Sequence, residues 1–204
     1  MKLYYSPGAC SLSPHIALLE AGLPYDLVRV DVRTKKLENG DDYLKINPKG
    51  QIPALGLDDG GLMTEGPVIV QMIADQAAGK NLAPATGSPE RYRLQEWLNF
   101  ITTELHKNFS PLFHPAIPEE VKAFFKDRIM GKFRYADDRL AGQDYLMGKQ
   151  FTVADGYLYT MLRWAEANKM DLSGLKNLMA FKDRVGARPK VQEALTKEGL
   201  MKAA

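Results

Sequence analysis

The 204-residue sequence contains one cysteine and three histidines, and its net charge is only +2. A single cysteine excludes a disulfide framework within the chain and is typical of a reducing compartment. The cysteine and histidines show none of the spacings of metal ligands, so we expect no metal site. The nearly balanced charge gives no indication of nucleic acid or an anionic membrane as a partner.

Long hydrophobic runs are also missing. No apolar stretch approaches the ~20 residues that cross a bilayer, and the opening residues reach glycine and proline too early for a signal peptide. The content of 45% hydrophobic and 25% charged residues is ordinary for a globular protein. We therefore expect a cytoplasmic protein with one large domain or two small ones.

The first eighty or so residues alternate between strand and helix patterns. Strands are predicted at 2–5, 27–32, 54–57 and 62–64, and helices begin near Leu12 and Pro67. The charged stretch 33–42 predicts a surface loop with a short helix after it, and Asp58 to Gly61 predicts a hairpin turn. This order is typical of a small sheet with helices packed on it.

After residue 79 the sequence predicts helices only. Residues 79–87 have the Gly, Ala and Pro content of a linker, and Ser88 and Pro89 begin a long helix. Further helices are predicted at 118–140, after a capping box at 152–155, and at 175–186 and 189–197. We therefore predict an α/β domain over 1–80 and an all-α domain over 88–204.

The stretch 47–67 combines two features of a ligand site. Ile52-Pro53 precedes an apolar strand, and a cis bond there would turn the backbone polar groups of Ile52 outward. Glu65-Gly66-Pro67 ends a strand and opens a helix, whose free amides would point at an anion. Together they indicate a small peptide ligand with a carboxylate; the alternative is an ordinary turn and cap.

Cys10 lies between the first strand and the first helix. A thiol at a helix start gains from the positive end of the helix dipole, which favours the thiolate. It could form a mixed disulfide with an outside thiol, but could not resolve it internally. The alternative is a small buried apolar residue. Ser11 is the next hydroxyl donor, and its alternative role is to cap the helix.

The long helix after Pro89 carries a polar stripe. Asn99, Thr103 and His106 are spaced by four and three residues, so on an α-helix they share one face. Such a stripe beside an apolar face can line a cleft between two domains; the alternative is a solvated stripe. His15 and His114 have no such neighbours.

Five motifs in this order resemble the cytosolic glutathione transferases, and more narrowly the bacterial beta class. The motifs are residues 7–11, 47–55, 62–66, 104–106 and 152–155, and the resemblance spans essentially the whole chain. It implies a thioredoxin-like N-terminal domain with a four-stranded mixed sheet, followed by an all-helical domain that forms the hydrophobic co-substrate side of the cleft. It also implies a homodimer, with glutathione as co-substrate.

The resemblance also assigns roles by position. Cys10, Ser11 and His106 would be catalytic. The glutathione-binding residues would be Cys10, Lys35, Gln51, Ile52, Pro53, Glu65, Gly66, Asn99, Thr103, Glu104, Leu105 and His106. Ile52 would pair its backbone with the cysteinyl part of glutathione, Glu65 and Gly66 would hold the γ-glutamyl end, and Lys35 would meet the glycyl carboxylate. Thr152 and Asp155 would be structural.

Gly66 departs from the family pattern, in which serine is common at this position. Glycine keeps the backbone amide but loses a hydroxyl, worth roughly one hydrogen bond, ~0.5–1.5 kcal/mol. The predicted function is conjugation of glutathione to hydrophobic electrophiles. The alternatives are a thiol–disulfide oxidoreductase that uses Cys10, and a non-catalytic ligand-binding protein.

Overall fold

The computed structural model describes residues 1–201. Its N-terminal part is a five-stranded mixed sheet in the order β3-β2-β1-β4-β5. The strands are β1 (Lys2–Tyr5), β2 (Asp26–Asp31), β3 (Lys36–Leu37), β4 (Ala54–Gly56) and β5 (Leu62–Thr64). β1 runs parallel to β2, and the other pairs are antiparallel. The four predicted strands are confirmed.

The fifth strand corrects the prediction of a four-stranded sheet. β3 lies within the charged stretch 33–42 and pairs Leu37 with Val30 and Lys36 with Asp31 at the sheet edge. Only two residues form it and only Leu37 is partly buried, so no apolar alternation marks it in the sequence. The predicted short helix follows as the 3₁₀ turn Tyr43–Lys45.

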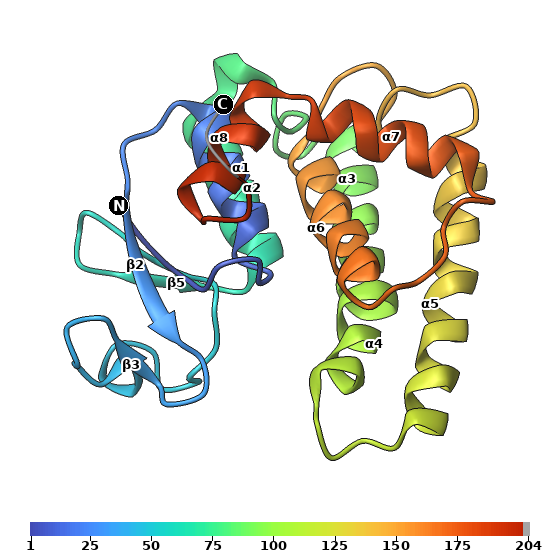
Figure 1. Cartoon of the computed structure of the whole chain (residues 1–204). Helices are drawn as coiled ribbons and strands as arrows, with labels where there is room; N and C mark the ends of the chain where they lie inside the picture. The colour runs from blue at the N-terminus through green and yellow to red at the C-terminus, as the bar shows by residue number, and fades with distance from the viewer. Residues whose placement is uncertain (202–204) are drawn as a thin grey trace.

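Two helices, α1 (Leu12–Ala21) and α2 (Gly66–Gln76), pack side by side against the sheet (Figure 1). Leu3 and Leu55 from the sheet and Ile16 from α1 belong to one fully buried core. Gly22 ends α1 in the left-handed conformation, at a φ of 69°. The core therefore runs from the sheet through α1 and α2 into the helical half of the molecule.

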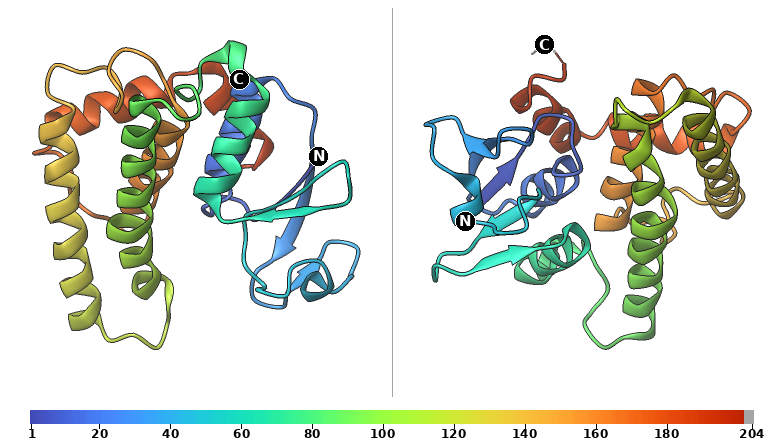
Figure 2. Two further views of the ribbon diagram at one scale, coloured as in Figure 1. Left: turned by 180° about the vertical axis from the view of Figure 1, so that it is seen from behind. Right: turned by 90° about the horizontal axis from the view of Figure 1, so that it is seen from below.

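The remaining helices form the second half (Figure 2). They are α3 (Pro89–Phe100), a π-helical segment (Ile101–His106), α4 (Lys107–Phe109), a 3₁₀ turn (Ser110–Phe113), α5 (Glu119–Arg139), α6 (Val153–Ala167), α7 (Lys176–Gly186) and α8 (Pro189–Lys197). Both predicted caps are present: the Ser88 hydroxyl accepts the Arg91 amide at 3.1 Å, and Asp155 accepts the Thr152 amide at 2.7 Å. None of the helices within residues 1–201 is long and apolar enough to cross a membrane.

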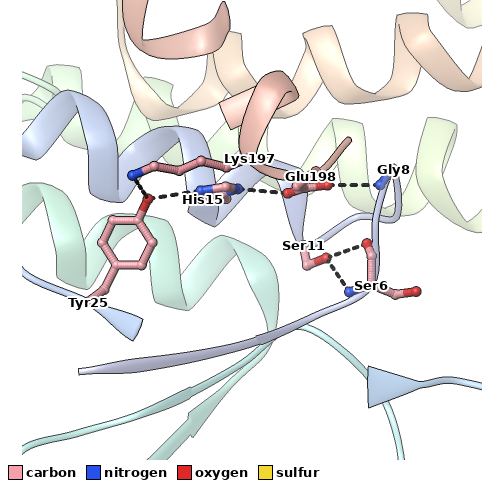
Figure 3. A network of polar contacts seen from close by, with 7 residues as sticks. All are labelled: Ser6, Gly8, Ser11, His15, Tyr25, Lys197 and Glu198. Carbon is pink, nitrogen blue, oxygen red and sulfur yellow. Dashed lines mark hydrogen bonds and ion pairs between the residues drawn. The ribbon is translucent and has the colours of Figure 1, made fainter. Parts of the chain in front are cut away.

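The end of the described chain returns to the N-terminal half, where α8 packs on α1 (Figure 1). Next to α8, the buried carboxylate of Glu198 accepts hydrogen bonds from His15 Nδ1 and the Gly8 amide, both at 2.8 Å (Figure 3). His15 Nε2 lies 2.9 Å from the Tyr25 hydroxyl. No sequence pattern connected His15 to Glu198, because the two residues are 183 positions apart. The domain limits of 1–80 and 88–204 stay a prediction.

Candidate active site

A cleft of about 290 Å³ lies between the sheet-bearing half and the helical half. The loop before α1, the segment around Ile52-Pro53 and the β5–α2 turn line one side, and the π-helical segment and Tyr157 line the other. Eight of the predicted site residues line it: Cys10, Lys35, Gln51, Ile52, Pro53, Glu65, Gly66 and His106. The distant motifs of the sequence therefore meet in one place.

The Ile52-Pro53 bond is cis. The Gln51 carbonyl before it is held from behind by the hydroxyl of the buried Tyr43, at 2.8 Å, and by the Asn47 side-chain amide, at 2.7 Å. The Ile52 carbonyl faces the Cys10 thiol, whose sulfur lies 3.3 Å away. A segment with backbone polar groups fixed at a cleft wall can recognise a peptide by hydrogen bonds.

The β5–α2 turn has the geometry expected of an anion site. Glu65 precedes the first turn of α2 with a φ of 69°, and Pro67 occupies a position that needs no amide partner. Lys49 Nζ contacts the Glu65 carboxylate at 2.7 Å and the Thr64 hydroxyl at 3.0 Å. The free amides of the turn suit a carboxylate, and the Glu65 carboxylate suits an amino group, so together they suit a ligand with both.

Lys35 brings a second cation to the cleft. Its Nζ donates to the Gly50 carbonyl at 2.7 Å, and its backbone has a φ of 58°. Gly50 has a φ of 62°, and a Cβ there would approach Leu44 Cδ2 to 2.9 Å, so another residue would be strained and would displace the Leu44 side chain. The ammonium groups of Lys35 and Lys49 can therefore bind separate anionic groups of one ligand.

The expected thiolate at Cys10 is wrong for the free protein. Desolvation by burial raises the pKa of Cys10 to about 12, although the backbone amides of Cys10 and Ser11 oppose this rise. The contact between Sγ and the Ile52 carbonyl also requires the sulfur to carry its proton. Burial outweighs the helix dipole, so Cys10 is a thiol at neutral pH.

Ser11 does not line the cleft. Its fully buried hydroxyl donates to the Ser6 carbonyl and accepts the Ser6 amide, both at 3.2 Å (Figure 3). It makes no capping hydrogen bond to α1. Ser11 therefore holds the loop that carries Cys10. The prediction of a catalytic role for Ser11 is not supported, because its hydroxyl is hydrogen-bonded within the loop and lies outside the cleft.

The polar stripe predicted on the long helix does not line the cleft of a single chain. Residues 101–106 are π-helical, and a π-helix closes its hydrogen bonds over five residues instead of four, so α-helical spacing no longer marks one face. Thr102 and His106 line the cleft, whereas Asn99 and Thr103 are exposed and outside it.

The two other predicted residues of this segment also lie outside the cleft of a single chain. Leu105 is fully buried in the core. Glu104 forms an ion pair with Lys132, with 2.7 Å between Oε2 and Nζ. Any contact that these residues make with a ligand in the cleft stays a prediction.

His106 lies in an aromatic frame that the sequence did not reveal. Its Nδ1 is 2.6 Å from the hydroxyl of Tyr157, and its ring meets Trp164 edge-on with ring centres 5.0 Å apart. Burial lowers the pKa of His106 to about 4, with a smaller contribution from the Lys107 cation, so the imidazole is neutral at pH 7. Tyr157 and Lys107 also line the cleft; Tyr157 is 51 positions away in the chain, and no spacing pattern connects it to His106.

The comparisons with known proteins agree with this arrangement. Residues 8–76 match the family model of the glutathione S-transferase N-terminal domain, and residues 103–198 match that of the C-terminal domain. The chain is 51% identical to glutathione S-transferase GstA of Escherichia coli O157:H7, over 98% of this chain and all of that protein.

Two solved structures superimpose closely. A sphingomonad glutathione S-transferase complexed with glutathione is 46% identical with a TM-score of 0.95, and a bacterial beta class enzyme from Sphingomonas chungbukensis is 46% identical with a TM-score of 0.96. Both matches cover 98% of this chain and 100% of the other. With the thioredoxin-like sheet, the cis-proline segment and the cleft against the helical half, these matches show that the chain belongs to the glutathione S-transferase family and resembles its bacterial beta class in structure.

Proposed function

We propose that this protein is a glutathione transferase that conjugates the thiol of reduced glutathione to hydrophobic electrophiles. The observation that carries the proposal is a single cleft with a cis-proline segment, an anion-binding turn and a separate lysine on one wall and a neutral histidine on the other. Each part suits one part of glutathione, and the family assignment supports the same ligand.

In this proposal the sheet-bearing wall binds the tripeptide. Ile52 pairs its backbone with the cysteinyl part, and Gln51 and Pro53 shape the segment around it. Glu65 and the amide of Gly66 hold the γ-glutamyl end. Lys35 meets the glycyl carboxylate by exchanging its present contact with the Gly50 carbonyl. The ligand's sulfur then lies between Cys10 and His106.

The chemistry is displacement or addition by a thiolate. The glutathione thiol loses its proton to solvent, and the sulfur forms a bond to the electrophilic carbon. A halide leaves, or the carbon–oxygen bond of an epoxide breaks and its oxygen takes up a proton. Hydrogen-bond donors beside the sulfur favour the anion, and binding both reactants in one cleft supplies proximity. Trp164, Phe109 and Phe113 form an aromatic cluster next to His106, with Phe113 52% exposed, which suits an apolar co-substrate.

We further propose a homodimer. The exposed Val68 on α2 lies beside the β5–α2 turn, and Trp97, Phe100 and Tyr135 form an aromatic cluster on α3 and α5. Burying these surfaces against a second copy would remove apolar area from water.

The dimer also offers a role to the predicted residues outside the cleft. The exposed Asn99 lies near the end of α3, which carries Trp97 and Phe100. The exposed Thr103 and its neighbour Glu104 lie in the π-helical segment that follows. These residues would reach glutathione in the cleft of the second copy. A monomeric mass by light scattering at micromolar concentration would contradict this assembly.

A second candidate function is thiol–disulfide exchange through Cys10. The thiol shares the cleft with the proposed position of the glutathione sulfur, which favours it. A pKa of about 12 counts against Cys10 as the attacking group at neutral pH. We therefore place conjugation first. The unpaired thiol suits a reducing compartment, and we propose that the protein acts in the cytoplasm.

The proposal is tested with the native chain and Cys10→Ala. We expect both to bind glutathione in calorimetry and both to turn over at least one of a panel of aryl halides, epoxides and enones. Loss of disulfide reduction alone in Cys10→Ala would show that exchange is a side activity. Tight binding of glutathione or apolar compounds without turnover of any electrophile would instead identify a ligand-binding protein.

A further inference from the structure

The contact between His106 and Tyr157 has a direction that the distance reveals. The two atoms are Nδ1 of His106 and the hydroxyl oxygen of Tyr157, and they lie 2.6 Å apart. Hydrogen bonds in which nitrogen donates to oxygen span about 2.7–3.2 Å, whereas those in which a hydroxyl donates to oxygen are shorter, at about 2.5–3.0 Å. The distance therefore favours the phenol as donor and Nδ1 as acceptor.

The surroundings of Tyr157 agree with this direction. Thr102 is the other polar neighbour; its hydroxyl donates to the Leu98 carbonyl at 2.7 Å, and its oxygen could still accept, but the hydrogen bond that the Tyr157 hydroxyl makes is the one with Nδ1 of His106. Desolvation by burial raises the pKa of the Tyr157 phenol, so it keeps its proton and must place it on an acceptor. Nδ1 of His106 is the acceptor at the shorter, well-formed distance.

The other imidazole nitrogen is open to the cleft. Within residues 1–201, Nε2 of His106 makes no protein hydrogen bond, and no buried side-chain nitrogen or oxygen there lacks a partner. Nε2 is therefore not buried, and His106 lines the cleft together with Cys10. Trp164 meets the imidazole edge-on, at 80°, which limits rotation of the ring.

We propose that Tyr157 is a positioning residue that donates its phenolic hydrogen to Nδ1 and holds His106 as the Nε2–H tautomer, with this N–H directed at the sulfur of bound glutathione. The direction at the sulfur rests on the proposed function; the tautomer does not. A neutral imidazole is a donor at only one nitrogen, so a fixed tautomer keeps the donor on the cleft side. Without Tyr157 the proton would distribute between both nitrogens.

The tautomer can be measured directly by nitrogen-15 NMR of histidine-labelled protein near pH 7. Long-range proton–nitrogen correlations distinguish a protonated from an unprotonated ring nitrogen, and loss of one signal pair in His106→Asn assigns His106 among the three histidines. We expect the native protein to show Nε2–H alone. An Nδ1–H tautomer at His106 in the native spectrum would overturn the proposal, whatever the Tyr157 variants show.

The variants test the role of the phenol. Tyr157→Phe should give averaged nitrogen shifts, whereas Thr102→Val should keep the native tautomer. Tyr159→Phe is the matched control, because it removes a hydroxyl from the same helix at a side chain that packs toward Gly186. A pure Nε2–H tautomer in folded Tyr157→Phe would contradict the proposal.

A second readout concerns the bound thiol. In Tyr157→Phe the apparent pKa of bound glutathione, followed by thiolate absorbance, should rise by up to about one unit, and kcat/KM for conjugation should fall about two- to tenfold. Tyr159→Phe should change neither quantity. If the native protein shows Nε2–H and Tyr157→Phe shows averaged shifts but no rise in the thiol pKa, the tautomer stands and the step to the sulfur is contradicted. Failure of the native protein to bind glutathione would contradict the proposed function while leaving the tautomer result in place.

Discussion

His15 and Glu198 form a fully buried pair, with 2.8 Å between Nδ1 and Oε1, although 183 positions separate them. The same carboxylate accepts the amide of Gly8, two residues before Cys10. The Gly8 carbonyl in turn accepts the indole N–H of Trp164 at 2.8 Å. The loop that carries the cleft cysteine is therefore held by two separate parts of the helical half.

Removal of the Glu198 carboxylate should destabilise the fold. In Glu198→Ala two donors lose their acceptor, at about 1–3 kcal/mol each, so we expect the free energy of unfolding in urea to fall by about 2–6 kcal/mol. Glu193→Ala, which removes a surface carboxylate paired with Lys190 and Lys197, should cost less than about 1 kcal/mol. If the free energy of unfolding fell equally in the two variants, the buried pair would contribute no more to stability than a surface ion pair.

Acid should destabilise the protein through His106. The pKa of this imidazole is about 4 in the folded protein and 6.5 when the side chain is fully solvated, so the unfolded chain binds more protons between these values. Stability therefore rises with pH through this window and is lost as pH falls from about 6.5 to 4, by about 3 kcal/mol in total from this group. His106→Gln should show a smaller loss between pH 7 and pH 4.5 in denaturant unfolding; the same loss as the native protein would contradict the shift.

Alkylation of Cys10 should be slow at neutral pH. With a pKa of about 12, the thiolate fraction rises about tenfold per pH unit up to that value. The rate of iodoacetamide addition, followed by intact mass, should keep rising from pH 7 to pH 10. Cys10→Ala is the blank, since it contains no other cysteine. A rate that levels off near pH 8 would show that the thiol is activated.

Gly66→Ser should strengthen glutathione binding. A Cβ at Gly66 would meet only Pro53 Cγ, at 3.7 Å, so it fits without movement. The added hydroxyl at the proposed γ-glutamyl carboxylate should lower the dissociation constant about two- to tenfold in calorimetry. Gly66→Ala carries the same Cβ without the hydroxyl and should bind like the native protein. Weaker binding in both variants would show that the turn does not tolerate a side chain.

Lys35→Met should weaken glutathione binding about ten- to a hundredfold, because a charged hydrogen bond is lost while the aliphatic stem remains. Binding of γ-glutamylcysteine, which lacks the glycyl carboxylate, should be the same in the variant and the native protein. Lys36→Met at the exposed neighbouring position is the control. An equal loss for both peptides would place Lys35 at another part of the ligand.

The sequence predicted most of the fold because the elements have clear local signals. The caps at Ser88 and Thr152 both lie where the sequence patterns place them. The strand β3 was not predicted, because two residues at a sheet edge are too few to show periodicity.

The site was only partly predictable. The π-helical segment has no sequence signal, so α-helical spacing placed Asn99 and Thr103 beside His106 when they lie elsewhere. The state of Cys10 depends on how much protein surrounds the sulfur, and the partners of His106 and His15 depend on which distant segments meet. These are properties of tertiary packing, which spacing within one segment does not contain.

The position of Glu198 late in the sequence determines when the cleft is completed during synthesis. Synthesis proceeds from the N-terminus, so the sheet, α1 and the Cys10 loop leave the ribosome long before residue 198 does. Until then the Gly8 amide and Nδ1 of His15 have no carboxylate to bind. The part that emerges first is thus completed late, and a nascent chain acquires its finished cleft only after residue 198 has left the ribosome.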